Sequence, residues 1–512
     1  MKQIISDIFS KNSKNHPMPL IVFEIANNHM GNVNHGLKII RELSAIAEKF
    51  PFTYGFKLQL RDLDSFIHPD FKNRSDMKYV KRFTETKLSE SEFRILKKEI
   101  IKRGHLAICT PFDEVSVDVL ERLNFDIIKI ASCSFTDWPL LEKIALTDTP
   151  IIASTAGISL KDIDKVVSFF QHRKKKLILM HCVGAYPTKS EELELNQIDL
   201  LKDRYPDVNI GYSTHEEPNN FIAGMLAATK GTRVFEKHVG IKSKEYALNQ
   251  YSATPHQVKK WLESIEVALK MSGVVGARAS FSKKELIDLQ QFKRGLYAKK
   301  RIAIGDKVNA SNTFFAFPNM KNQILANDFS KYAEFTMVKT VEKNQPIFSD
   351  SVKKVDNRLD VDSAVILAQK MLKKSKIALP AKLDFELSHH YGISLFRQYG
   401  ATIIDIINRN YCKKIVVLFP KQIHPVHYHK KKEETFHILY GEFTITLNGA
   451  KKYLKAGDVL TIESGVKHGF TTKLGGILEE ISTTSLASDS YYVDNKINEN
   501  KYRKTRLTNW VD

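Results

Sequence analysis

The sequence predicts an α/β protein: a (β/α)8 TIM barrel over residues 1–290, then a small strand-rich domain and a C-terminal all-β barrel. Between about residues 20 and 240, eight short apolar runs alternate with polar segments of helical spacing. This pattern is typical of parallel strands covered by helices, and eight repeats in about 220 residues favour a closed barrel. No GxGxxG turn follows the first run, which disfavours a dinucleotide-binding sheet.

The apolar runs are short and rich in β-branched residues. They are LIVFEIA, YGFKLQ, LAICTPF, FDIIKIAS, PIIAST, LILMHCV, VNIGYSTH and RVFEKHVG. Each has a polar residue at or just past its end: Glu24, Lys57 with Gln59, Thr110, Lys129 with Ser132, Ser154, His181, Ser213 with His215, and Glu236 to His238. In a barrel these side chains converge on one face, where such enzymes keep their active sites.

The rest of the chain divides by composition. We expect a small strand-rich domain at 291–355 and a linker with an amphipathic helix at 356–380. A second all-β domain follows at 381–490, and a polar tail at 491–512.

Charge and cysteine usage exclude several classes. The net charge is +20, yet the Lys and Arg residues are spread along the chain without a nucleic-acid motif. We therefore expect no nucleic-acid partner and interpret the charge as a lysine-rich solvated surface. The four cysteines lie far apart without a CxxC pair, and three of them stand in strand-like runs, which indicates small buried side chains in a reducing compartment. With no signal peptide and no apolar run of membrane length, we expect a cytoplasmic protein.

The barrel motifs resemble those of the sialic acid (N-acetylneuraminate) synthase family. The segments FEIANNHMGNVNHGLKII, FKLQ, TPFD, KIAS, STAG, HCVGAYP, GYSTHE and EKHVG stand in that family's order. AKKRIAIGDKV is similar to its C-terminal antifreeze-like (SAF) domain. The resemblance implies condensation of phosphoenolpyruvate with a sugar aldehyde to give a 3-deoxy-2-ulosonic acid, here for a surface polysaccharide.

The resemblance implies a phosphoenolpyruvate site made of Lys57, Thr110, Lys129, Ser132, Ser154 and Ser213. The chemistry supports it, since a phosphate ester needs cationic and hydroxyl donors. A buried lysine such as Lys129 would be costly without a partner. The hydroxyls have a plainer interpretation, because such groups commonly satisfy the backbone at strand ends.

The resemblance also implies a metal in the barrel. His215 and His238 would hold Mn2+ or Mg2+ and polarise the aldehyde, with Glu24 near the reacting carbons. Either histidine alone would more often be a structural, hydrogen-bonded residue. Together at adjacent strand ends, within the full motif set, they favour metal.

The sugar side departs from the family pattern. The Gly-Glu expected after KIAS is Cys133 and Ser134, and the usual Asn before Tyr-Pro is Gly184. An Asp-His pair is replaced by Asn249 and Gln250, and an Arg of the SAF domain by Phe317. We expect sugar contacts from Gln59, Ser134, Tyr186 and Asn249, and an acceptor that differs from the family's usual sugar.

The C-terminal region resembles a cupin through HPVHYHKKKEETFHILYGEF and AGDVLTIESGVKHGF. The HxH spacing puts two imidazoles on one face of a strand. His427, His429, Glu434 and His468 form a three-histidine, one-glutamate set suited to Mn, Fe, Ni or Zn.

The function expected is that of a metal-dependent synthase acting on phosphoenolpyruvate and a sugar aldehyde, in a domain-swapped homodimer. Two alternatives remain. One is a non-catalytic sugar-binding or scaffold protein, and the other a bifunctional synthase whose cupin modifies a sugar.

Overall fold

The computed structural model describes residues 2–10, 18–72, 74–330, 332–380, 382–486 and 488–510. The chain divides into two compact units, residues 1–279 and 280–512, and each is described by itself. Among the described residues, no helix combines the length and apolar character needed to cross a bilayer.

The first unit is a closed barrel of eight parallel strands, as the sequence predicts. The strands are β1 (Leu20–Ala26), β2 (Thr53–Leu60), β3 (Leu106–Pro111), β4 (Ile127–Ile130), β5 (Ile151–Ser154), β6 (Leu177–Cys182), β7 (Asn209–Thr214) and β8 (Val234–His238). Strand β8 pairs with β1 and closes the ring. The predicted fold class is therefore confirmed for this unit.

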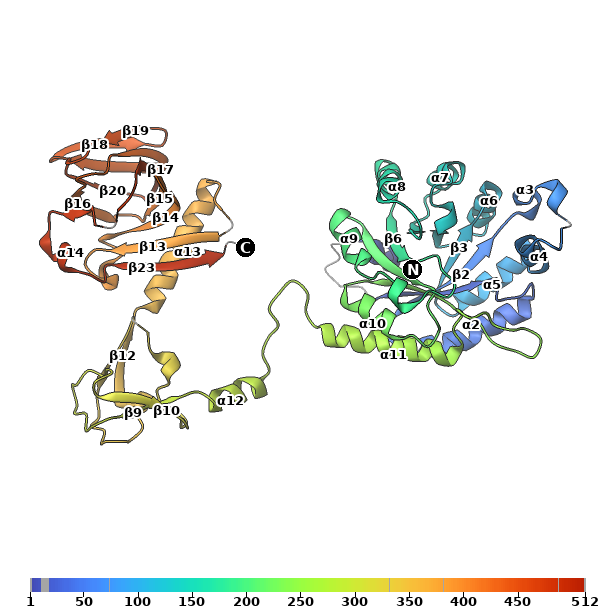
Figure 1. Cartoon of the computed structure of the whole chain (residues 1–512), viewed down its shortest axis with the longest axis horizontal. Helices are drawn as coiled ribbons and strands as arrows, with labels where there is room; N and C mark the ends of the chain where they lie inside the picture. Colours follow the sequence, from blue (N-terminus) through green and yellow to red (C-terminus); the bar gives the residue numbers. More distant parts are fainter. Residues whose placement is uncertain are drawn as a thin grey trace. The chain divides into compact units, whose positions relative to one another are not determined.

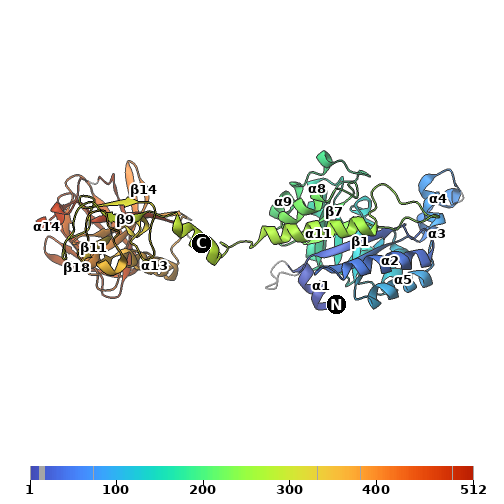
Figure 2. The ribbon, with the colours of Figure 1, turned by 90° about the horizontal axis from the view of Figure 1, so that it is seen from below.

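Helices surround the strands, as Figures 1 and 2 show. They are α2 (Val33–Ala47), α3 (Leu63–Phe66), α4 (Lys78–Glu85), α5 (Glu90–Lys102), α6 (Glu114–Arg122), α7 (Trp138–Ala145), α8 (Leu160–His172), α9 (Gln197–Arg204), α10 (Ile222–Thr229) and α11 (Pro255–Ser272). The local sequence determines where two of these helices begin. A capping box at Ser89 begins α5, and Thr254 with Pro255 begins α11.

The amino-terminal helix α1 (Lys2–Phe9) closes one end of the barrel. Its Ile5 and Ile8 pack with Leu20, Val22 and Val234, which begin strands β1 and β8. The interior at this end is apolar, so the polar residues at the strands' carboxyl ends are left to form the opposite mouth.

Close packing inside the barrel requires glycine at Gly211. A Cβ atom there would lie 2.1 Å from Met180 Sδ. The side chain of Met180 therefore occupies the space that any larger residue on β7 would need.

The second unit begins with α12 (Lys283–Gln291) and a small β segment. Its strands are β9 (Gly295–Ala298), β10 (Thr313–Ala316), β11 (Ala333–Met337) and β12 (Val352–Asp356), around a core that includes Leu296, Phe335 and Ile347. Its assignment as a SAF domain stays a prediction.

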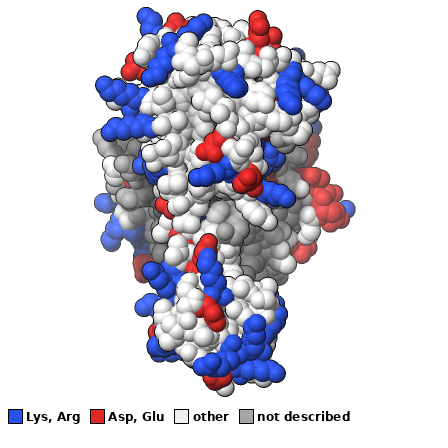
Figure 3. Space-filling view, turned by 90° about the vertical axis from the view of Figure 1, so that its left-hand side faces the viewer, with Lys and Arg blue, Asp and Glu red and all other residues white. Residues whose placement is uncertain are grey.

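The rest of the unit is the predicted all-β domain, whose 11 strands are hydrogen-bonded into one sheet. The strands are β13 (Lys382–His389), β14 (Gly400–Asn408), β15 (Tyr411–Leu418), β16 (Ile423–Tyr428), β17 (Glu434–Leu447), β18 (Ala450–Lys455), β19 (Val459–Ile462), β20 (His468–Thr471), β21 (Gly476–Thr483), β22 (Tyr491–Tyr492) and β23 (Lys504–Trp510). On the face shown in Figure 3, basic side chains are interspersed with acidic ones.

Two boundaries differ from those expected. Helix α13 (Arg358–Ser375), expected in a linker, buries Ala364 and Ala368 against Phe385 and Val417 of the sheet. The expected polar tail contains α14 (Asn495–Glu499) and strand β23, which pairs with β13. Both segments are therefore parts of the β domain.

Candidate functional site

A buried charge network occupies the barrel mouth around Glu236. Its Oε1 lies 2.8 Å from Lys57 Nζ and 3.2 Å from Lys129 Nζ. Ser213 donates a hydrogen bond to the same oxygen over 3.1 Å. These residues are at most 4% exposed. One carboxylate thus holds two ammonium groups from β2 and β4 in fixed positions.

Glu24 supplies the second negative charge. Its Oε2 lies 2.5 Å from Lys57 Nζ, and its Oε1 accepts from the backbone nitrogen of Ala26 over 2.6 Å. Burial lowers the pKa of Lys57, but Glu236 and Glu24 outweigh this and raise it above its usual value. The two lysines and two glutamates balance in charge, so no net charge is buried.

Lys129 stands in a different environment. Its pKa is lowered, because burial and the nearby Lys57 outweigh the attraction of Glu236. It also donates to Ser154 Oγ over 2.7 Å. A cation with one carboxylate and a hydroxyl as neighbours would gain from a further anion.

The alternation of strand β8 separates Glu236, Lys237 and His238. Glu236 and His238 point into the barrel, whereas Lys237 lies on the outer face. There its Nζ is 3.0 Å from Glu216 Oε1 and 5.5 Å from the ring centroid of Trp261. Lys237 therefore belongs to the packing between strands and helices.

His215 and His238 lie side by side at the mouth. Their ring centroids are 5.2 Å apart and inclined at 44°. Burial is the main reason that the pKa of each is lowered to about 3. Both imidazoles are therefore neutral near pH 7, the state in which a histidine can bind a metal.

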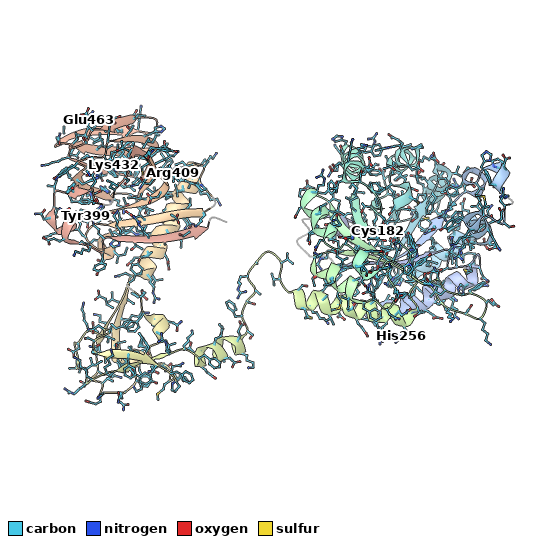
Figure 4. All side chains as sticks on the ribbon, viewed as in Figure 1. Cys182, His256, Tyr399, Arg409, Lys432 and Glu463 are labelled. Carbon is cyan, nitrogen blue, oxygen red and sulfur yellow. The ribbon has the colours of Figure 1, made fainter. Side chains whose placement is uncertain are left out.

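The two nitrogens of each of these rings differ in their hydrogen bonding. His215 Nδ1 donates to the carbonyl of Val183 over 2.8 Å, which leaves the lone pair on Nε2. Nδ1 of His238 is buried without a hydrogen-bond partner among the described residues. Cys182, labelled in Figure 4, has its Sγ 3.7 Å from His215 Nδ1. The pair offers two donors, and further positions would fall to substrate or water.

The remaining predicted phosphoenolpyruvate ligands are less closely tied to this network. Ser132 Oγ accepts from the backbone nitrogen of Ala156 over 3.1 Å, a role that also satisfies the backbone. Thr110 Oγ1, at the end of β3, is buried without a partner among the described residues. An unsatisfied buried hydroxyl is costly, and a ligand oxygen would relieve that cost.

The predicted sugar-side residues have different surroundings at the barrel mouth. Gln59 Nε2 lies 3.4 Å from Glu24 Oε2, and the Tyr186 ring packs on His215 with centroids 4.1 Å apart. Asn249 reaches Asn28 over 3.4 Å, beside the end of β8. Ser134 is buried, whereas its neighbour Cys133 is exposed. His181, also at a strand end, bonds the Leu193 carbonyl and lies outside this group.

Residues outside the predicted set also belong to this region. Glu236 is its electrostatic centre, and a charged residue within a buried strand was the available signal. The Arg61 guanidinium lies 3.6 Å from the ring centroid of Phe112 and 4.0 Å from that of Phe83, and it donates to Gln59. Its stacking partners come from distant segments, so no local pattern indicates it.

A second cluster lies in the β domain. Donor atoms of His427, His429, Glu434 and His468 lie within 4.8 Å of one another, and all four residues are buried. This is the set that the sequence predicts for a metal. His468 Nε2 is 2.6 Å from Glu434 Oε1.

Backbone carbonyls fix the tautomers of this cluster. Nδ1 of His427, His429 and His468 donates to the carbonyls of Pro425, Asp489 and Val466, over 3.1, 2.5 and 2.9 Å. Because a carbonyl can only accept, each Nε2 then carries a lone pair. A lone pair facing a carboxylate at 2.6 Å requires a proton or a cation between them, so the donor set fits a divalent ion.

Lys432 adds a cation beside the cluster and lies among the strands of the β domain (Figure 4). Its Nζ contacts Glu434 and is 2.7 Å from Glu480 Oε1. Burial lowers the pKa of Lys432, but the two carboxylates more than offset this and raise it above its ordinary value.

Two family models match the chain. Residues 55–276 match the NeuB family, and residues 414–474 match the cupin domain. The cupin match contains all four clustered residues, His427, His429, Glu434 and His468.

Known proteins are similar over half to two thirds of the chain. A solved protein of Chromobacterium violaceum, provisionally named spore coat polysaccharide biosynthesis protein E, is 49% identical with a TM-score of 0.63, covering 65% of this chain and 99% of that one. An uncharacterised protein of Methanocaldococcus jannaschii is 31% identical over 58% of this chain and 84% of its own. N-acetylneuraminate-9-phosphate synthase of Drosophila melanogaster is 29% identical over 50% and 68%.

Proposed function

The chain belongs to the NeuB family, and from that premise we propose that its barrel condenses phosphoenolpyruvate with a sugar aldehyde. The products would be a 3-deoxy-2-ulosonic acid and inorganic phosphate, for the synthesis of a polysaccharide. The observation that carries this proposal is the fixing of Lys57 and Lys129 by Glu236 at the barrel mouth.

The lysines and hydroxyls provide the donors that an enol phosphate needs. Lys57, Lys129, Ser154 and Ser213 lie on four strands whose carboxyl ends meet at one face. Held by Glu236 before any ligand arrives, the ammonium groups need little reorganisation to bind phosphate and carboxylate oxygens. Thr110 Oγ1 offers a further hydroxyl that lacks an internal partner among the described residues.

The proposed reaction balances without an outside oxidant or reductant. C3 of the enol forms a bond to the aldehyde carbon, and the aldehyde oxygen gains a proton. Water adds at C2 and loses one proton. The bond from C2 to the phosphate oxygen then breaks, and the new C2 hydroxyl gives its proton to the departing phosphate as C2 becomes a carbonyl. Glu24, adjacent to Lys57, would accept the first proton that the water loses, which balances the proton gained by the aldehyde oxygen.

His215 and His238 would hold the barrel's divalent ion, with manganese favoured by two imidazole ligands. When bound, such an ion supplies Lewis-acid polarisation of the aldehyde oxygen. The neutral imidazoles and the free nitrogen of His238 support this assignment.

The acceptor is proposed to differ from the N-acetylated sugar that the family resemblance implies. The mouth carries Cys133 and Ser134 where the resemblance leads us to expect a carboxylate, and Ser134 is buried. Tyr186, Gln59 and Asn249 remain available for sugar hydroxyls. A site built without that carboxylate should discriminate by hydrogen bonding against a sugar that needs it.

The test is aldehyde-dependent phosphate release from phosphoenolpyruvate in the presence of Mn2+ and a panel of sugar aldehydes. We expect release with at least one aldehyde, and its loss in Lys129→Ala and His238→Ala. The exposed residues Lys161 and His172 provide matched controls, since Lys161→Ala and His172→Ala should retain activity. No release with any aldehyde, or full activity in Lys129→Ala, would contradict the proposal and favour a sugar-binding protein.

A second site is proposed because of one specific observation, the cluster of His427, His429, Glu434 and His468. We propose that it holds a divalent transition-metal ion.

Two copies of the chain are further proposed to form a homodimer, as the family resemblance implies. Sedimentation of the full-length protein would test this proposal.

A further inference from the structure

The β domain encloses a cavity of about 250 Å3 beside the second cluster. His427, His429 and Glu434 line it, so an ion held by the cluster would face this space. Strands β13, β14, β15, β17, β21 and β23 supply residues of the remaining wall. Four protein ligands leave coordination positions for oxygen atoms of a second molecule.

Basic side chains outnumber acidic ones around the cavity. The basic residues are Lys414, Lys432, Arg503, Lys504 and Arg506, and the acidic ones are Glu386, Asp405, Glu434 and Glu480. The lining therefore has one positive charge in excess, and a divalent ion would raise the excess to three. Uncompensated positive charge in an enclosed space favours an anionic ligand.

Two of the basic groups have no carboxylate within ion-pair distance among the described residues. Lys414 Nζ donates to Ser485 Oγ over 2.8 Å. The guanidinium of Arg503 lies 4.9 Å from the ring centroid of Tyr492. These cations are available for a ligand carboxylate or phosphate.

Two more of the basic groups, Lys504 and Arg506, share a single partner. Lys504 Nζ lies 2.7 Å from Glu386 Oε1, and Arg506 lies 2.9 Å from the other oxygen of the same carboxylate. One carboxylate compensates two cations here, as Glu236 does in the barrel. This side of the cavity thus remains electropositive.

We propose that this cavity is a binding site for an anionic sugar acid of the class that the barrel is proposed to make. The carboxylate and the neighbouring C2 oxygen of such an acid form a chelating pair for a metal ion, and Lys414 and Arg503 balance the remaining negative charge. The choice of a sugar acid rests on the proposed function of the barrel, whereas the negative charge of the ligand follows from the cavity alone. A neutral sugar aldehyde would leave the basic excess uncompensated.

The proposed ligand therefore belongs to the class of the product of the condensation and not to that of its sugar substrate. A reaction or transfer that consumes a 2-oxo or 2-hydroxy sugar acid would begin from a complex of this kind. The class of ligand distinguishes this role from preparation of the neutral acceptor.

The experiment uses the full-length protein with Lys129→Met and His238→Ala, which disable the barrel and remove its proposed metal site, loaded with Mn2+. N-acetylneuraminic acid serves as the anionic probe and N-acetylmannosamine as the neutral one. Water-proton relaxation by the bound Mn2+ reports ligand access to the ion, and equilibrium dialysis gives the dissociation constants. We expect the acid to bind at least tenfold more tightly than the neutral sugar and to change the relaxation.

Two substitutions in the cavity are tested separately, so that misfolding of one variant would not decide the result. Arg503→Gln and Lys414→Gln should each weaken binding of the acid at least tenfold, and His427→Ala should abolish its effect on relaxation. Lys451→Gln removes the same charge from an exposed position outside the cavity and should change nothing. Equal binding of the neutral sugar, or acid binding unchanged in both Arg503→Gln and Lys414→Gln, would overturn the proposal.

The result is separable from that of the barrel. Acid binding without aldehyde-dependent phosphate release in the wild type would retain an anion site and reject the proposed condensation. Phosphate release without acid binding to the β domain would do the reverse.

Discussion

Glu236 Oε1 lies 2.8 Å from Lys57 Nζ, deep in the barrel mouth. The same carboxylate lies 3.2 Å from Lys129 Nζ. A buried carboxylate that serves two ammonium groups fixes both of them before any ligand is present. Such preorganisation is what a site for a multiply charged phosphate ester requires.

Removing that carboxylate should destabilise the barrel. In Glu236→Gln, two buried ammonium groups lose their shared partner, and the expected cost is about 3 kcal/mol or more. Urea unfolding followed by tryptophan fluorescence measures it. Glu263→Gln is the matched control, because Glu263 forms an exposed pair with Lys259 and should contribute less than about 1 kcal/mol. Equal effects of the two substitutions would contradict the account.

Packing at Gly211 predicts a steric effect. In Gly211→Ala the new Cβ would approach Met180 Sδ to 2.1 Å, so one strand or the methionine must shift. The expected loss of stability is about 1–3 kcal/mol. Gly184→Ala, whose Cβ would make an ordinary 3.6 Å contact, should change stability little. Thermal unfolding of both variants checks the difference.

The buried imidazole of His29 predicts a pH dependence of stability. Burial, with a smaller effect of Arg82, lowers its pKa from 6.5 to about 4. The unfolded chain therefore binds a proton between these values that the folded barrel does not. The stability contribution is complete above pH 6.5 and is lost as the pH falls toward 4.

Lowering the pH from 7 to 4.5 should thus cost about 2 kcal/mol through this residue. His29→Gln should flatten the pH dependence by that amount, whereas His172→Gln, at an exposed position, should leave it unchanged. Urea unfolding at the two pH values gives the comparison. An identical slope in His29→Gln would show that this histidine is not kept neutral by burial.

The two proposed metal sites predict a stoichiometry of two ions per chain. His427→Ala should remove one equivalent of metal and leave aldehyde-dependent phosphate release intact. His238→Ala should remove the other equivalent together with that activity. Elemental analysis after dialysis against Mn2+ counts the ions. Two equivalents retained in both variants would contradict both assignments.

Much of the fold could be predicted from the sequence, because the strands of both barrels can be recognised from short local sequence patterns. Strands of the parallel barrel are buried on both faces and appear as apolar runs, so each lysine or glutamate within them stands out. The same contrast indicated Lys57 and Lys129. Which carboxylate each lysine contacts depends on the register of β8 with β1 and β7, which spacing along the chain does not fix.

Both boundary differences arise because α13 and β23 pack on the β domain through contacts that the local sequence pattern does not reveal. Strand β23 appears polar because Lys504 and Arg506 line a charged cavity, while Leu507 packs outward against the cluster that contains α13. A strand with a polar inner face lacks the usual apolar alternation. Helix α13 resembled a linker helix because its partner surface is far away in the sequence.

Binding of phosphoenolpyruvate to the full-length protein, measured by titration calorimetry, tests the central claim most directly. The wild type and the exposed-site variant Lys161→Met should bind it equally. Lys129→Met, which removes one of the two buried ammonium groups, should weaken binding at least a hundredfold while the protein remains folded. Unchanged affinity in Lys129→Met would show that the lysines around Glu236 serve the barrel's internal structure and do not form a phosphate site.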